Sequence, residues 1–208
     1  MNFQATQIEV KLCNHFKEFW HQKLFTDCIL ITTSFNEKSQ IFESKSIFCH
    51  CILLAQYSKY FKAYFLSSEN SLTFGEPKTI QIEFNPNNCF EFVVSLIYEN
   101  YALISTDLIP DILKVMHYYK FESLSKIVLS TVSSIIKKDF LYYINKFIEL
   151  DISEFAVDLI PEVVPHFRNI LLSKPSDITL NQIFSSISPF LFSVLLKNKD
   201  IQWIMDDS

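Results

Sequence analysis

A single glycine, Gly75, is present among 208 residues, and this scarcity limits the possible folds more than any other feature of the sequence. Average usage predicts about 15 glycines in a chain of this length. Walker loops, dinucleotide-binding fingerprints, kinase Gly-rich loops and Gly-flanked serine elbows each need several, because only glycine lets the backbone approach a phosphate or adopt positive φ without strain. The sequence therefore argues against the nucleotide-binding and catalytic classes that depend on these loops.

The low glycine content also has a compositional cause. Arg168 is the only arginine among 18 basic residues, whereas phenylalanine occurs 21 times. Residues with GC-rich codons are scarce and residues with AT-rich codons are abundant. We therefore interpret the loss of glycine mainly as compositional pressure that the fold tolerates.

Charge and hydrophobicity narrow the classes of partner. Hydrophobic residues make up 49% of the chain, and 18 basic against 23 acidic residues give a net charge of −5. Disorder requires low hydrophobicity, and a nucleic-acid groove requires a dense cationic stripe. The only basic cluster is Lys137–Lys138. We expect a folded protein that does not bind nucleic acid.

Cysteine usage and the N-terminal residues bear on the cellular compartment. Five cysteines without regular spacing and thirty initial residues without an apolar signal core predict a reducing compartment, the cytoplasm or the nucleus. Residues 178–196 carry no charge over a length that could span a membrane. Their many polar side chains and Pro189 favour two short helices instead, so we expect no membrane segment.

Hydrophobic periodicity predicts an α+β fold. A capping-box pattern at Thr6 and Glu9 predicts an amphipathic helix over about 6–23. From residue 86 onward the pattern is helical throughout, with helices opening near Pro86 and Thr106. Strand-like runs occur at 28–33, 40–48 and 79–84, and short helical patterns at 49–56 and 58–66. We expect a small three-stranded sheet flanked by helices, followed by an all-α tail.

The segment from residue 25 to residue 65 resembles the BTB/POZ family. That family opens with a strand headed by aspartate, here Asp27, and continues with an aromatic residue, a small residue and histidine, here Phe48-Cys49-His50. An apolar helix, a helix containing Tyr-Phe and, further on, a helix ending in Ile-Tyr follow in the same order. The signature residues are Asp27, His50, Leu54, Ala55, Ser58, Tyr60, Phe61 and Tyr98.

The resemblance implies three segments and shows two departures. It implies a BTB/POZ domain over 25–135, a dimerisation helix over 1–24 and a BACK-like helical extension over 136–208, with a local match at Leu195-Leu196-x-x-x-Asp200. The family's glycine after Ile-Tyr-x is Asn100 here, and asparagine tolerates left-handed turns. The usual basic residue after the histidine is Cys51, which argues against recruitment through the family's charged pocket.

The resemblance implies a homodimer. In long-form BTB domains an N-terminal helix crosses to the partner subunit. The corresponding interface would comprise Ile8, Leu12, Phe16, Phe19, Trp20 and Asp27. The alternative is that the same apolar stripe packs within one chain.

The resemblance also raises the question of cullin binding. BTB adaptors dock a cullin scaffold partly through a hydrophobic-x-Glu motif after the Tyr-Phe helix. Ungapped alignment puts Glu69 and Ser71 at these positions, which does not fit, whereas Phe74-Gly75-Glu76 has the right chemistry five residues downstream. Either the loop carries an insertion or the motif is coincidental. The implied docking surface comprises Tyr64, Phe65, Phe74, Glu76 and Phe121. The resemblance equally implies that most of these aromatic residues belong to the core.

Two functions remain open. The chain is either a dimeric adaptor that brings an unidentified client protein to a cullin-RING ubiquitin ligase, or a dimerising scaffold or decoy without cullin binding. The five histidines have no nucleophile motif around them. Three consecutive residues such as Cys49-His50-Cys51 project about 100° apart on a helix and cannot all face one zinc ion. We expect no catalytic residue, metal or cofactor, and interpret these three residues as a buried histidine and two core thiols.

Overall fold

The computed structural model describes residues 7–11, 16–36, 40–67, 76–99 and 101–152, and residues 155, 189, 193 and 197 singly. The chain divides into two compact units, Met1–Thr131 and Val132–Ser208. No helix among the described residues is long and apolar enough to cross a membrane. The predicted helices within 178–196 and most of the BACK-like extension lie outside the described residues.

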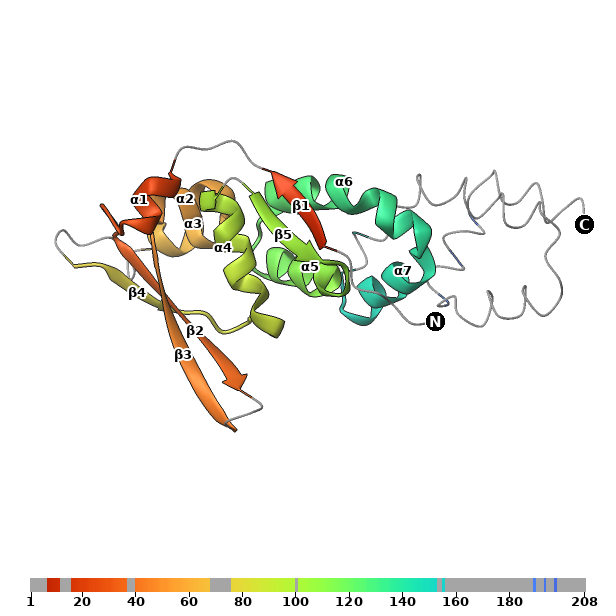
Figure 1. Ribbon diagram of the computed structural model, residues 1–208, viewed down its shortest axis with the longest axis horizontal. Coiled ribbons are helices and arrows are strands. Elements are labelled where there is room, and N and C mark those ends of the chain that lie inside the picture. Colours follow the sequence, from red (N-terminus) through yellow and green to blue (C-terminus); the bar gives the residue numbers. More distant parts are fainter. Residues whose placement is uncertain are drawn as a thin grey trace, which may run out of the picture. The chain divides into compact units, whose positions relative to one another are not determined.

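The first unit contains a three-stranded sheet with the order β3-β2-β4 (Figure 1). Strand β2 (Cys28–Asn36) pairs antiparallel with β3 (Ile41–Cys49) and parallel with β4 (Lys78–Gln81). The three predicted strands are confirmed, although β2 continues beyond the predicted end at residue 33. Side chains alternate between the two faces, and the buried face carries Cys28, Leu30, Ile47, Cys49 and Ile80.

The two predicted short helices follow β3. They are α2 (Cys51–Tyr57) and α3 (Lys59–Leu66). Ser58 separates them in an extended conformation, and its Oγ accepts a hydrogen bond from the Phe61 backbone N–H at 3.0 Å. Serine is a favoured N-cap because its side chain satisfies one of the orphan N–H groups of the first turn.

The predicted N-terminal helix over 6–23 is wrong. Residues Gln7–Lys11 form strand β1, and among the described residues of this range only Lys17–His21 forms a helix, α1. Strand β1 pairs antiparallel with β5 (Tyr101–Ser105), in a register that joins Val10 to Ala102. Strand β5 also corrects the expectation that every element after residue 86 is helical. The pairing of two distant short segments overrides the local helical spacing.

The remaining elements are helical, as predicted. After a 3₁₀ turn at Pro86–Asn88 comes α4 (Cys89–Glu99), and after a second turn at Thr106–Leu108 comes α5 (Ile109–Tyr118), with Pro110 in its first turn. They are followed by α6 (Glu122–Lys138) and α7 (Phe140–Glu149). The core of the first unit includes an aromatic group whose members are almost fully buried: Phe61, Phe90, Tyr119 and Phe121.

Candidate functional site

The signature histidine joins three elements of the first unit. The His50 backbone N–H donates to the Tyr98 hydroxyl at 2.7 Å, and His50 Nδ1 lies 3.0 Å from the same oxygen. His50 Nε2 lies 2.8 Å from the Leu24 carbonyl oxygen. A neutral ring with hydrogen on Nε2 satisfies all three contacts, with the hydroxyl donating to Nδ1. His50 therefore fixes the turn after α1 against the start of α2 and the end of α4.

The thiols beside His50 belong to the core, as the sequence indicated. Cys49 and Cys51 are buried, and burial raises the pKa of the Cys49 thiol above its ordinary value. Among the described residues there is no group of three or more side chains that could hold a metal ion. These residues therefore stabilise the strand–helix junction.

Asp27 reaches the beginning of α2. Its Oδ1 accepts a hydrogen bond from the Cys51 backbone N–H at 2.6 Å. A carboxylate is favourable at a helix N-terminus because the unpaired N–H groups carry partial positive charge. The helix thus provides the electrostatic partner that a basic side chain after the histidine would otherwise supply.

Helix α1, the residue before it and the turn after it carry a cluster of exposed apolar side chains. We call Phe16, Phe19, Leu24 and Phe25 the aromatic patch. The ring centroids of Phe16 and Phe19 lie 6.3 Å apart, and those of Phe19 and Phe25 lie 5.9 Å apart. Phe25 is 82% exposed. Such a cluster on the surface of one chain is typical of an interaction site.

The backbone of the same turn is strained. Lys23 and Phe25 have φ angles of 53° and 57°, where the Cβ of a bulky residue crowds the backbone. Strained residues of this kind persist when neighbouring contacts hold them. Here the His50 contact to the Leu24 carbonyl holds the segment between them. The fold therefore maintains Phe25 in an exposed position at a conformational cost.

A groove of about 920 Å³ lies beside Asp27. Its apolar lining includes Ile52, Ala55, Phe65 and Leu66, from α2 and α3. Ile52 is 73% exposed and Leu66 is 75% exposed. Sequence reasoning assigned neither of these two residues to a site.

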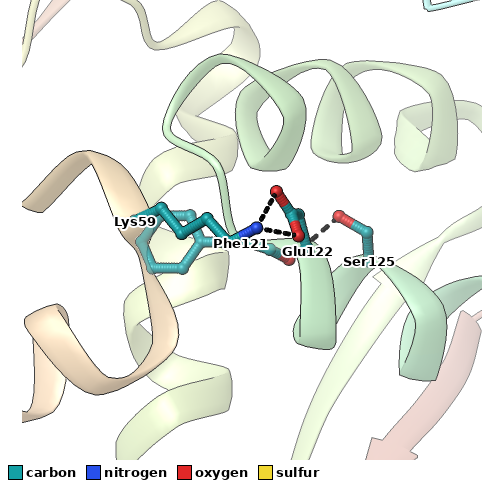
Figure 2. A network of polar contacts seen from close by, with 4 residues as sticks. All are labelled: Lys59, Phe121, Glu122 and Ser125. Atoms are coloured by element: carbon teal, nitrogen blue, oxygen red, sulfur yellow. Dashed lines mark hydrogen bonds and ion pairs between the residues drawn. The ribbon is translucent and has the colours of Figure 1, made fainter. Parts of the chain in front are cut away.

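One side of this groove is closed by a polar joint between α3 and α6 (Figure 2). Lys59 Nζ lies 2.9 Å and 2.7 Å from the two carboxylate oxygens of Glu122. The hydrogen bond from Lys59 lowers the pKa of the Glu122 carboxyl. Behind this pair, Ser125 Oγ donates to the Phe121 carbonyl at 3.0 Å. The joint fixes the start of α6 next to the start of α3.

The predicted cullin-docking residues do not form one exposed surface. Phe121 is fully buried, with its ring 6.0 Å from that of Phe61, so it is a core residue and not part of a docking surface. Phe65 is nearly buried and Tyr64 is half-buried. Glu76 is exposed, and Phe74 lies outside the described residues. Of the two alternatives that the sequence left open for Phe121, docking surface or core, its burial supports the core.

The predicted dimer residues are only partly brought together. Phe16 and Phe19 are exposed in the aromatic patch, whereas the Trp20 ring stacks on Tyr98 at 5.0 Å and an angle of 16°. Ile8 lies on β1, opposite Ile104 in β5, and Leu12 lies outside the described residues. Sequence reasoning missed Leu24 and Phe25, because residues in a turn contribute to no helical periodicity.

The remaining signature residues have structural roles. Leu54 and Phe61 are buried, Ala55 lines the groove, and the Tyr60 ring lies edge-on to Tyr119 at 5.2 Å. The spacing of these residues in the motif is therefore explained by their packing contacts. They do not assemble a reactive centre.

Comparison with known protein families gives one finding on this chain. The family model described as the BTB/POZ domain matches residues 16–141, more than half of the chain. The match begins just before α1 and ends within α7. No curated protein matches the chain significantly.

Proposed function

Because the chain belongs to the BTB/POZ family, we propose that it is a dimerising interaction module whose aromatic patch binds the same patch of a second copy. BTB/POZ domains are non-catalytic modules for protein–protein interaction. The observation that carries the proposal is the cluster of Phe16, Phe19, Leu24 and Phe25 on the surface. The resemblance to long-form BTB domains, in which the N-terminal region makes the dimer, supports the choice of partner.

Energetics also favour a partner at this patch. Exposed aromatic rings gain free energy when a partner removes them from water, and buried aromatic anchors dominate the affinity of protein interfaces. In one chain, Phe25 has a strained backbone conformation and its ring stays exposed to solvent. A second copy that buries the ring would contribute free energy that offsets this backbone strain.

Light scattering on the purified chain tests the dimer. We expect a mass of at least twice 24.4 kDa at micromolar concentration. Phe25→Asp should raise the dissociation constant by roughly 30-fold or more, because it removes a central aromatic anchor and introduces a charge. Leu103→Asp is the matched control, since Leu103 is exposed on β5 outside the patch. A monomeric wild-type chain, or a dimer that is insensitive to Phe25→Asp, would contradict the proposal.

A finer role as a cullin adaptor is a second proposal. The exposed Glu76, which follows Phe74-Gly75 and precedes β4, supports it because the acid is accessible. The burial of Phe121 and Phe65 favours the alternative, a scaffold without cullin binding. The BACK-like extension over 136–208, the segment boundaries and the cytoplasmic or nuclear location stay predictions.

A pull-down with the cullin of the organism that encodes the chain separates these two roles. For an adaptor, we expect wild-type chain to be retained and the double variant Phe74→Ala/Glu76→Ala to lose at least tenfold in retention. Asp107→Ala is the control, because Asp107 is also exposed but lies in the turn before α5. Retention that ignores the double variant rejects the motif. The scaffold role predicts that the wild-type chain itself is not retained.

A further inference from the structure

The distal part of the β2–β3 hairpin is an arm of two strands. Strand β4 pairs only with Cys28–Ile31 of β2, whereas β2 and β3 remain paired as far as Asn36 and Ile41. Figure 1 shows the hairpin extending away from the helices of the first unit. A two-stranded ribbon is only marginally stable in water. Thr32 is still buried, and its hydroxyl donates to Glu91 of α4 at 2.8 Å. Beyond it, the arm lacks the third strand that stabilises the base of the sheet.

Strand β3 forms the outer edge of this arm. It lies at one end of the strand order, with no neighbour on its outer side among the described strands. Residues 41–46 are all exposed, including Ile41 at 60% and Phe42 at 70%. An edge strand of this length presents a row of outward N–H and C=O groups that can pair with another strand.

The charges of β3 make this edge complementary to itself. Glu43 and Lys45 are the only charged residues in β3. If two copies of β3 pair antiparallel about a two-fold axis through Ser44, Glu43 of each copy faces Lys45 of the other. Every other two-fold register of β3 with itself loses both pairs. Opposite charges placed directly across an antiparallel pair stabilise it, and like charges destabilise it.

The same register fits the sheet faces and brings together one apolar pair. It places Ile41 opposite Ile47 and Phe42 opposite Ser46. Paired positions differ by an even number of residues, so side chains from both copies point to the same face of the joined sheet. The charges and the sheet faces therefore agree on this register.

We propose that β3 binds β3 of a second copy in this antiparallel register centred on Ser44. The contact joins two three-stranded sheets into one six-stranded sheet and is isologous, because both copies contribute the same strand. It is separate from the aromatic patch. A chain that uses both two-fold contacts assembles beyond the dimer, into tetramers or longer chains.

Charge reversal tests this contact in the Phe25→Asp background, where the aromatic patch is disabled. In that background sedimentation velocity should show a monomer–dimer equilibrium. Lys45→Glu puts like charges opposite each other at both ends of the pairing, and Glu43→Lys does the same with the other sign. Each should raise the dissociation constant by about fivefold or more. Lys62→Glu, at an exposed position on α3, is the control that changes the net charge as Lys45→Glu does.

Complementation makes the test specific for the register. The double variant Glu43→Lys/Lys45→Glu restores both opposite-charge pairs, so its dissociation constant should return to within about twofold of the background. An equimolar mixture of the two single variants should also associate, because the sets of charges on the two chains are then complementary. Failure of both rescues, or single variants that do not weaken association, overturns the proposal. Both residues are exposed, and circular dichroism checks that each variant is folded.

The outcomes for the two contacts are distinguishable. If only the patch associates, Phe25→Asp gives a monomer at every concentration. That result overturns β3 self-pairing and leaves a strand from another protein as the occupant of the edge. If only β3 associates, the wild-type mass falls with Lys45→Glu and ignores Phe25→Asp, which supports β3 pairing and contradicts the dimer proposed for the patch.

Discussion

At the scale of single residues, Ser58 combines two roles that the sequence motif does not separate. Its Oγ accepts from the Phe61 N–H as the cap of α3, and the same hydroxyl donates to the Tyr119 carbonyl at the end of α5. The side chain is almost fully buried. One hydroxyl therefore satisfies both an orphan helix N–H and a buried carbonyl.

Ser58→Ala should lower the free energy of unfolding by about 2 kcal/mol. Loss of a cap costs about 1 kcal/mol, and a buried carbonyl left without its donor adds a similar amount. Urea denaturation monitored by circular dichroism measures the change. Ser123→Ala, at an exposed position on α6, should change stability by less than about 0.5 kcal/mol. Equal effects for the two variants would contradict the double role of Ser58.

At the scale of elements, the sequence predicts segments whose pattern is local and misassigns those whose partner is distant. Strands β2 and β3 and helices α2 and α3 are adjacent along the chain, so periodicity and the Ser58 cap predict them well. Strand β1 pairs with β5 across more than ninety residues. Residues 7–11 alternate as a strand should, but Ile8 also fits a helical spacing with Leu12 and Phe16, and only the distant partner decides between them.

The candidate site follows the same division. The motif around His50 was predictable because its residues are close in sequence and buried. The aromatic patch depends on the turn at Lys23 and Phe25, where two bulky residues adopt positive φ. Residue type argues against that conformation, so the exposure of Phe25 could not be predicted from the sequence. The burial of Phe121 is likewise set by contacts with Phe61 and Phe90, which are distant along the chain.

At the scale of the whole molecule, buried thiols and a buried tyrosine hydroxyl make the free energy of unfolding decrease at alkaline pH. Burial raises the pKa of the Cys49 thiol and raises that of Cys89 to about 12. Burial likewise raises the pKa of the Tyr119 hydroxyl to about 12. In the unfolded chain thiols ionise near pH 8.5 and phenols near pH 10. These groups therefore stay protonated in the folded state over a pH range in which the unfolded state loses protons.

The sign of the effect follows from this difference. Each group contributes stability that is fully present below its unfolded pKa and is lost as pH rises above it, because ionisation then favours the unfolded chain. Above pH 8.5 Cys49 and Cys89 should each lower the free energy of unfolding by about 1.4 kcal/mol per pH unit. Urea unfolding between pH 7 and pH 10.5 measures the slope of the free energy of unfolding against pH.

Cys89→Ala should reduce this slope by about 1.4 kcal/mol per pH unit. Val93→Ala is the control, because it truncates a buried side chain on the same helix. It should lower the free energy of unfolding at every pH and leave the slope unchanged. A slope that Cys89→Ala does not alter would show that this thiol ionises alike in both states, in conflict with its burial at the start of α4.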